Sequence, residues 1–148
     1  METSIGSLLE HWLDGAESLE PRELAERLGD IDRVIRTAHA AQAHLTAIAR
    51  RRSAYRDDGH RAVSGWIQAS IRVSPGDAQR LTKLAELCAD LPLVWQHLAT
   101  GTLGVRQAND LAHAYANPRV RDQVESVVEL FVAVAELAPY RQFKAKLD

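Results

Sequence analysis

The residues that most suggest chemistry form a short polar run, Asp57-Asp58-Gly59-His60. A carboxylate beside an imidazole raises the imidazole pKa, so this run could act as an acid–base pair. The run also fits a helix terminus, because Gly59 suits the left-handed backbone that ends a helix and the aspartates then face solvent. We favour the second interpretation and predict no catalytic residue in this chain.

Histidine is frequent but is not spaced for metal binding. The histidines are His11, His39, His44, His60, His97 and His113. No two of them are three or four residues apart, the spacing that places two imidazoles on one helical face, and Cys88 is the only cysteine. The sequence also contains no nucleophile elbow and no glycine-rich phosphate loop. We therefore predict neither a metal site nor a cofactor, and no enzymatic activity.

Charge is segregated along the chain, although the net charge is only -2. Residues 1–32 hold nine acidic and two basic residues, residues 33–83 hold three acidic and ten basic residues, and residues 84–148 hold eight acidic and six basic residues. The basic block supplies the positive charge that a phosphate backbone attracts. Alternatively, the acidic first third folds onto the basic block and neutralises it. Both interpretations stay open at this point.

Residues 62–89 fit a helix-turn-helix. The first helix should span Ala62 to Ile71, and the second should run from Pro75 to about Ala89, with Ser74 as its N-cap. Five positions that hold such a motif together carry apolar or small residues: Ile67, Ile71, Val73, Ala78 and Leu81. Two positions depart from the pattern, because Arg72 replaces the usual turn glycine and Gln68 replaces a usual alanine.

The exposed face of the second helix would offer polar side chains to a DNA groove. Gln79 and Arg80, beside Gly76, are candidates for base edges, whereas Arg72 and Lys83 are candidates for phosphates. Further phosphate contacts are expected from Arg50, Arg51, Arg52, Arg56 and Arg61. The alternative is that Arg80 and Lys83 form ordinary surface ion pairs with Asp77, Glu86 or Asp90. We predict duplex DNA as the partner, with a protein-interaction or scaffold domain, including a homodimer, as the alternative.

Two tryptophans, Trp66 and Trp95, stand on apolar faces of predicted helices, and we expect both in the core. Trp66 also lies near basic residues, so base stacking is an alternative role for it.

Helical spacing dominates the sequence, which predicts an all-α fold: a single-domain, multi-helix bundle over residues 1–148 with one long helix and helix-turn-helix-like hairpins. We expect an acidic helix within residues 1–18 and a short helix over Pro21–Leu28 that Gly29 ends. The long helix should then begin at Ile31, with Asp30 as its N-cap, and run to about Tyr55. Later helices are expected over Leu93–Thr100, Val105–Ala116 and Pro118–Glu136, and from Pro139 onward. The stretch LATGTLGVRQANDLA resembles the first hairpin, and we interpret it as helix packing with Arg106 as an outlying polar contact.

Length and composition suit an ordinary soluble domain. The chain has 148 residues, of which 46% are hydrophobic, enough for one core without disulfides or metals. A single cysteine excludes an intrachain disulfide, no apolar run approaches the roughly 18 residues of a membrane span, and the first residues lack the order of a signal peptide. We expect a cytoplasmic protein that does not enter a membrane.

Several blocks together resemble a known family. DGHRAVSGWI, VSPGDAQR, LAELCADLP, HLATGTLGVRQANDLA and APYRQF occur in this order over about Leu19 to Leu147. They are similar to the helical region called the domain of unknown function 222, also known from the 13E12-repeat proteins. That region commonly precedes an HNH endonuclease domain, so the resemblance implies a role near DNA and a nuclease domain as a partner. No HNH-type histidine cluster is present in this sequence, so no nuclease residue is carried over.

Overall fold

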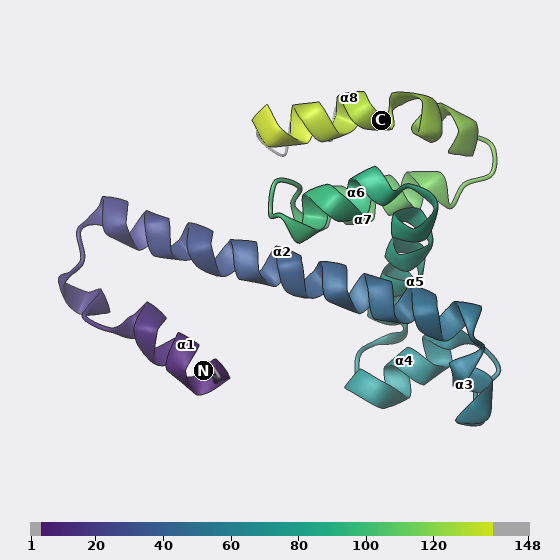
Figure 1. The fold of residues 1–148 in the computed structure, drawn as a ribbon, viewed down its shortest axis with the longest axis horizontal. Helices are drawn as coiled ribbons and strands as arrows, with labels where there is room; N and C mark the ends of the chain where they lie inside the picture. Colours follow the sequence, from purple (N-terminus) through teal and green to yellow (C-terminus); the bar gives the residue numbers. More distant parts are fainter. Residues whose placement is uncertain (1–3, 138–148) are drawn as a thin grey trace.

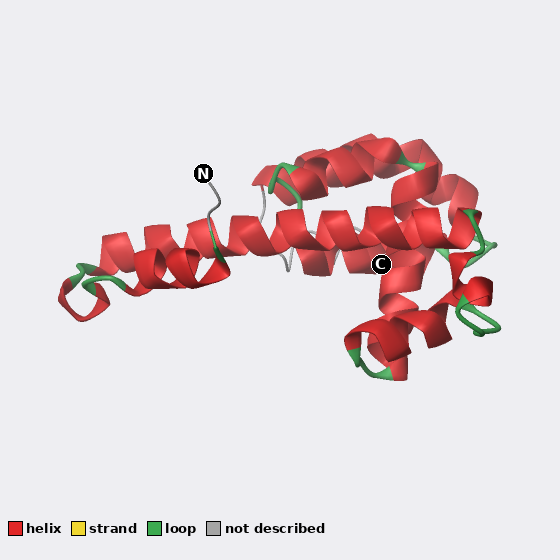
Figure 2. Cartoon of the chain, turned by 60° about the horizontal axis from the view of Figure 1, so that its bottom comes forward, coloured by secondary structure: helices red, strands yellow, loops and turns green. Residues whose placement is uncertain are grey.

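The computed structural model describes residues 4–137, which form eight α-helices and one 3-10 turn (Figure 1). The elements are α1 (Ile5–Leu13), η1 (Ala16–Ser18), α2 (Pro21–Arg51), α3 (Ala54–Asp57), α4 (Val63–Ile71), α5 (Pro75–Asp90), α6 (Pro92–Ala99), α7 (Val105–Tyr115) and α8 (Arg121–Leu137). The described residues contain no strand (Figure 2), which confirms the all-α prediction. The helix predicted from Pro139 lies outside the described residues.

The long helix α2 is continuous where a break was predicted. The expected stop at Gly29 is wrong, because a glycine inside an exposed helix costs only about 0.5–1 kcal/mol relative to alanine. Two ion pairs support the helix just beyond that glycine. Arg33 lies 3.6 Å from Asp30, and Arg36 Nε lies 2.6 Å from Asp32. Asp30 is thus a side chain within α2 and not the cap of a new helix.

The far end of α2 is also earlier than predicted. The helix ends at Arg51 and not near Tyr55, because Ser53 adopts a left-handed backbone with φ 55°. The short helix α3 then carries the chain to Gly59, which has φ 86°. The predicted role of Gly59 as a left-handed helix stop is therefore confirmed.

The acidic helix expected within residues 1–18 is shorter in the structure, where α1 spans Ile5–Leu13. α1 ends at Leu13, Gly15 turns with φ 64°, and the 3-10 turn η1 follows. The Arg27 guanidinium joins α1 to α2 by donating to the carbonyl oxygens of Trp12 and Asp14, at 2.9 and 2.6 Å. No described residue of α1 is buried, so α1 contributes nothing to the core.

The core lies between the second half of α2 and helices α5 to α8. Its largest fully buried side chains are Leu84, Leu87, Leu98, Leu103, Leu111 and Val94. Trp95, which was predicted in the core, is partly buried and packs against it. The Trp95 indole donates a hydrogen bond to the Ala40 carbonyl at 3.0 Å. Cys88 is buried here, and the burial raises the pKa of its thiol to about 12. The thiol therefore stays protonated at neutral pH, as a core residue does.

Two helical hairpins, α4–α5 and α6–α7, belong to the bundle. In the first, Ser74 caps α5 by accepting from the Asp77 amide at 3.1 Å, and Pro75 occupies the first turn, both as predicted. Between α4 and α5, Val63, Ile67 and Ala78 form a second buried cluster with Trp66 and Leu81 packed against it. The α4–α5 helix-turn-helix is therefore a packed unit.

The second hairpin joins α6 to α7 through Gly101, which has φ 84°. α2 fastens this turn: Arg36 donates to the Gly101 carbonyl at 2.7 Å and Thr37 donates to the Ala99 carbonyl at 2.8 Å. α2 thus fixes the position of the second hairpin.

Within residues 4–137, no helix combines the length and the apolar composition that a membrane span needs.

Candidate nucleic-acid interface

The first two turns of α5 project from the bundle. Gly76, Gln79 and Arg80 are exposed in these turns, whereas Leu84 and Leu87 further along α5 are fully buried. The buried half anchors the helix in the core, and the exposed half presents its polar side chains to solvent. A recognition helix in a helix-turn-helix uses its first turns in the same way.

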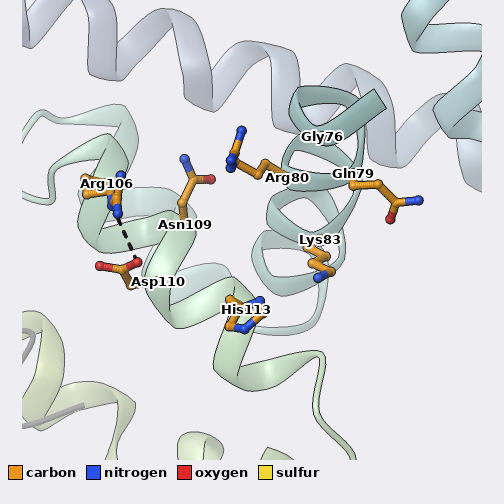
Figure 3. Close-up of a pocket in the computed structure, with 8 residues that line it drawn as sticks. All are labelled: Gly76, Gln79, Arg80, Lys83, Arg106, Asn109, Asp110 and His113. Atoms are coloured by element: carbon orange, nitrogen blue, oxygen red, sulfur yellow. Dashed lines mark ion pairs between the residues drawn. The ribbon is translucent and has the colours of Figure 1, made fainter. Parts of the chain in front are cut away.

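A hollow of about 360 Å³ lies between these turns and α7 (Figure 3). Its lining residues are Gly76, Gln79, Arg80 and Lys83 from α5 and Arg106, Asn109, Asp110 and His113 from α7. Each set follows the three-four spacing that places residues on one side of a helix. The four α5 residues are those that the sequence predicted to face a groove.

The two helices lie at an angle to each other, and Figure 3 shows Arg106 and Gly76, in their first turns, further apart than His113 and Lys83. The partial positive charge of a helix N-terminus favours negatively charged groups at each of these first turns. Guanidinium and ammonium groups add to the positive character of this surface.

Ion pairs partly offset this charge. Arg80 lies 2.7 Å from Asp77 and Arg106 lies 3.6 Å from Asp110, so the predicted alternative of a surface pair for Arg80 is realised. Both partners of the Arg80–Asp77 pair are exposed, and an exposed pair contributes roughly 0–1 kcal/mol, so Arg80 can exchange Asp77 for a phosphate. In the second pair, the Asp110 side chain is only 12% exposed. Lys83 has no acidic partner within the described residues.

Each helix also contributes one amide side chain. Gln79 comes from α5 and Asn109 from α7, and neither makes a side-chain hydrogen bond to a described residue. A primary amide can donate and accept at once, which matches the N7 and N6 edge of adenine. The hollow therefore combines groups that bind phosphate with groups that can read a base.

Asn109 and His113 were missed as site residues from the sequence. Their place depends on how α5 packs against α7, which is a long-range contact. The signal that could have found them is the likeness of LATGTLGVRQANDLA to the first hairpin, since a second hairpin brings a second helix of the same kind.

The other predicted residues do not line this hollow. Arg72 is exposed in the turn between α4 and α5, and Arg52 and Arg61 are exposed between α2 and α4. Arg56 is exposed on α3 with its guanidinium 5.7 Å from the Tyr55 ring centroid. Arg51 lines a separate hollow that uses another side of α5, with Ala85 and Cys88.

Arg50 also lies outside the hollow, in an ion pair with Glu86 at 3.6 Å. Glu86 forms a second ion pair with Arg121 of α8 at 3.3 Å. The structure thus brings Gln79, Arg80 and Lys83 together and leaves the other predicted arginines outside their site.

A second hollow, of about 390 Å³, adjoins the first and shares Arg80 and Asn109 with it. It extends the polar surface to His39 and Gln42 of α2. Burial lowers the pKa of His39, so this imidazole is neutral at physiological pH and can accept or donate a hydrogen bond.

The polar run at Asp57–His60 is a connection between helices. Asp58 follows α3 and accepts a hydrogen bond from the Trp66 indole at 2.8 Å. Trp66, which was predicted in the core, is half-buried against the α4–α5 cluster, so it lies at the edge of the core and not fully inside it. Within the part of the chain that the structure describes, no three His, Cys, Asp or Glu residues gather as a metal site would need.

The acidic first segment does not cover the hollow. α1 lies alongside the first half of α2, whereas α4 and α5 lie at the second half (Figure 1). Acidic partners of α2 arginines in this region are neighbours within the same helix. The basic residues of α5 therefore keep their access to solvent.

Comparison of this chain with protein-family models, with curated proteins and with solved structures gave no match.

Proposed function

We propose that this chain is a non-catalytic helical module that binds duplex DNA through the hollow between α5 and α7. The observation that carries the proposal is the convergence of Gln79, Arg80 and Lys83 with Asn109 from a second hairpin. The cations would hold phosphates, and the two amides would contact base edges. The exposed first turns of α5 would enter the groove.

The chemistry of the hollow favours nucleic acid over a protein partner. None of its lining side chains is large and apolar, whereas the centre of a protein interface is rich in aromatic and aliphatic groups. Protein–DNA interfaces are more polar and more positive. Three cations, two amides and one carboxylate fit that composition.

The resemblance to the domain of unknown function 222 supports the same role. Its helical region commonly precedes an HNH endonuclease domain, and a helical module that holds DNA would position such a nuclease. We therefore include a nuclease domain among the proposed partners. A separate observation, the exposure of apolar side chains on α2 such as Leu28 and Leu45, favours the alternative, a protein-interaction or scaffold domain without nucleic-acid contact.

The test is the affinity for a fluorescent duplex, measured by anisotropy between about 50 and about 200 mM salt. We expect affinity to fall steeply with salt, because phosphate contacts release counterions. The double variant Arg80→Ala/Lys83→Ala should bind on the order of tenfold more weakly at the lower salt, and its log–log salt slope should decrease by about two.

A matched control loses the same charge elsewhere. Arg22→Ala/Arg119→Ala removes two exposed arginines, one on α2 and one between α7 and α8. This variant should bind almost as the parent chain does. Absence of binding at the lower salt, or equal losses in the two double variants, would show that the hollow is not the DNA site.

A further inference from the structure

A hollow of about 270 Å³ lies where α2, α5 and α6 meet, on the other side of α5 from the proposed DNA site. Alanines line it from both of the longer helices: Ala43 and Ala47 from α2, and Ala85 and Ala89 from α5. Larger side chains at these positions would fill the space. The volume is slightly below the range of about 300–1,000 Å³ that drug-sized ligands occupy, so the hollow suits a small molecule.

The inner wall of this hollow is apolar and uncharged. Ala43 and Ala85 are fully buried. Trp95 also lines the hollow, and the hydrogen bond from its indole to the Ala40 carbonyl, at 3.0 Å, fixes the ring. Burial raises the pKa of the Cys88 thiol, so this lining group is neutral at physiological pH. Such a wall favours the apolar part of a ligand.

Two exposed polar side chains, His44 and Arg51, line the same hollow. The His44 ring lies 5.6 Å from the Trp95 ring, between centroids, at an interplanar angle of 43°. An imidazole donates a hydrogen bond in either protonation state, and a guanidinium carries five N–H donors and a permanent positive charge. The exposed rim of the hollow therefore offers donors and positive charge next to an apolar wall.

The charge of Arg51 is not compensated at this hollow. Among residues 4–137, no acidic side chain lines it, and Arg51 has no ion-pair partner. Two acids of α5, Glu86 and Asp90, flank the lining residues but are engaged elsewhere. Glu86 pairs with Arg50 at 3.6 Å, and Asp90 accepts a hydrogen bond from the Tyr115 hydroxyl at 2.8 Å. A negatively charged ligand group would therefore fit this rim best.

We propose that this hollow binds a small organic anion, namely a carboxylate attached to an apolar body about the size of one aromatic ring. Arg51 and His44 would hold the carboxylate, and the body would lie between the alanines and the Trp95 ring. A phosphate ion or a DNA phosphate has no apolar body, so it would leave the inner wall in contact with water. Arg51, predicted from the sequence as a phosphate contact, thus has a different role in this proposal.

NMR correlation spectra of the full, nitrogen-labelled chain without DNA test the site, with phenylacetate as the probe. The indole N–H signal of Trp95 should shift until the site is saturated, with a Kd on the order of 1 mM or below. The indole signals of Trp12 and Trp66 do not belong to the hollow and should stay in place. A Trp95 signal that does not move, or equal shifts of all three, would overturn the proposal.

Related probes separate the two parts of the ligand. Phenylacetamide keeps the ring without the charge, and acetate keeps the carboxylate without the ring. Each should bind at least about tenfold more weakly than phenylacetate, because each loses one of the two contacts. Inorganic phosphate should bind no better than acetate. If any of these three bound as tightly as phenylacetate, the hollow would not select an organic anion.

Two substitutions with matched controls locate the site. Arg51→Gln should weaken phenylacetate binding about tenfold or more and leave phenylacetamide binding unchanged, whereas Arg52→Gln, at an exposed residue outside the hollow, should change neither. Ala89→Leu should abolish binding of both probes by filling the hollow, and Ala41→Leu, at an exposed alanine outside it, should not. Equal losses in a variant and its control would contradict the assignment. None of these measurements uses DNA, so this site and the DNA site stand or fall separately.

Discussion

Arg72 adopts a backbone conformation that its side chain makes costly. Its φ of 55° lies in the left-handed region, where a residue with a Cβ costs roughly 1–2 kcal/mol more than in the right-handed region. The turn between α4 and α5 therefore forms without the glycine that helix-turn-helix turns usually have, at the expense of strain. Arg72 is exposed, so nothing buried compensates.

Arg72→Gly should raise the free energy of unfolding by about 0.5–1 kcal/mol, because glycine reaches this conformation without a Cβ clash, although it loses more entropy on folding. Urea unfolding followed by circular dichroism measures the change. Arg61→Gly, in a connection where φ is not positive, is the control and should be neutral or slightly destabilising. If Arg72→Gly lowered stability, the side chain of Arg72 would have a contact that the turn requires.

At the scale of single residues, the sequence located half of the candidate site. Gln79, Arg80 and Lys83 could be predicted because one helix periodicity places them on one side of α5. The same periodicity could not show that Arg51 lies outside the candidate site. Whether it shares a surface with Arg80 depends on the angle at which α2 crosses α5, and local spacing carries no information on that angle.

At the scale of elements, α2 shows why caps can mislead. Gly29 followed by Asp30 matches the end of one helix and the start of another, yet both residues are inside one helix of 31 residues. The loss from one glycine is small, and helix continuation gains a backbone hydrogen bond at each residue. By contrast, Ser74-Pro75 was predicted correctly, because a proline in the first turn and a serine cap act together.

Gly29→Ala should stabilise the protein by about 0.5–1 kcal/mol, because Gly29 is in an exposed helix interior and a Cβ there meets no atom within 4 Å. Gly59→Ala is the matched control. It also meets no neighbour, but its φ of 86° should make the substitution destabilising by about 1 kcal/mol. Thermal unfolding by far-UV circular dichroism measures both. Destabilisation by Gly29→Ala would mean that α2 is broken there in solution.

At the scale of the whole molecule, charge is separated along α2. The acidic half of α2 extends away from the core, and α5, whose first turns line the polar hollow, lies at the other half of α2 (Figure 1). The acids of residues 21–32 therefore lie away from the basic residues of α5.

This separation predicts that the acidic half of α2 does not weaken DNA binding. Glu23 and Glu26 are exposed there, and interactions between exposed charges are largely screened beyond about 10 Å at about 0.1 M salt. Glu23→Gln/Glu26→Gln should therefore leave the affinity for the duplex within about twofold of the parent chain, measured by anisotropy at about 100 mM salt. A gain of about tenfold or more would mean that the acidic half lies over the hollow in solution.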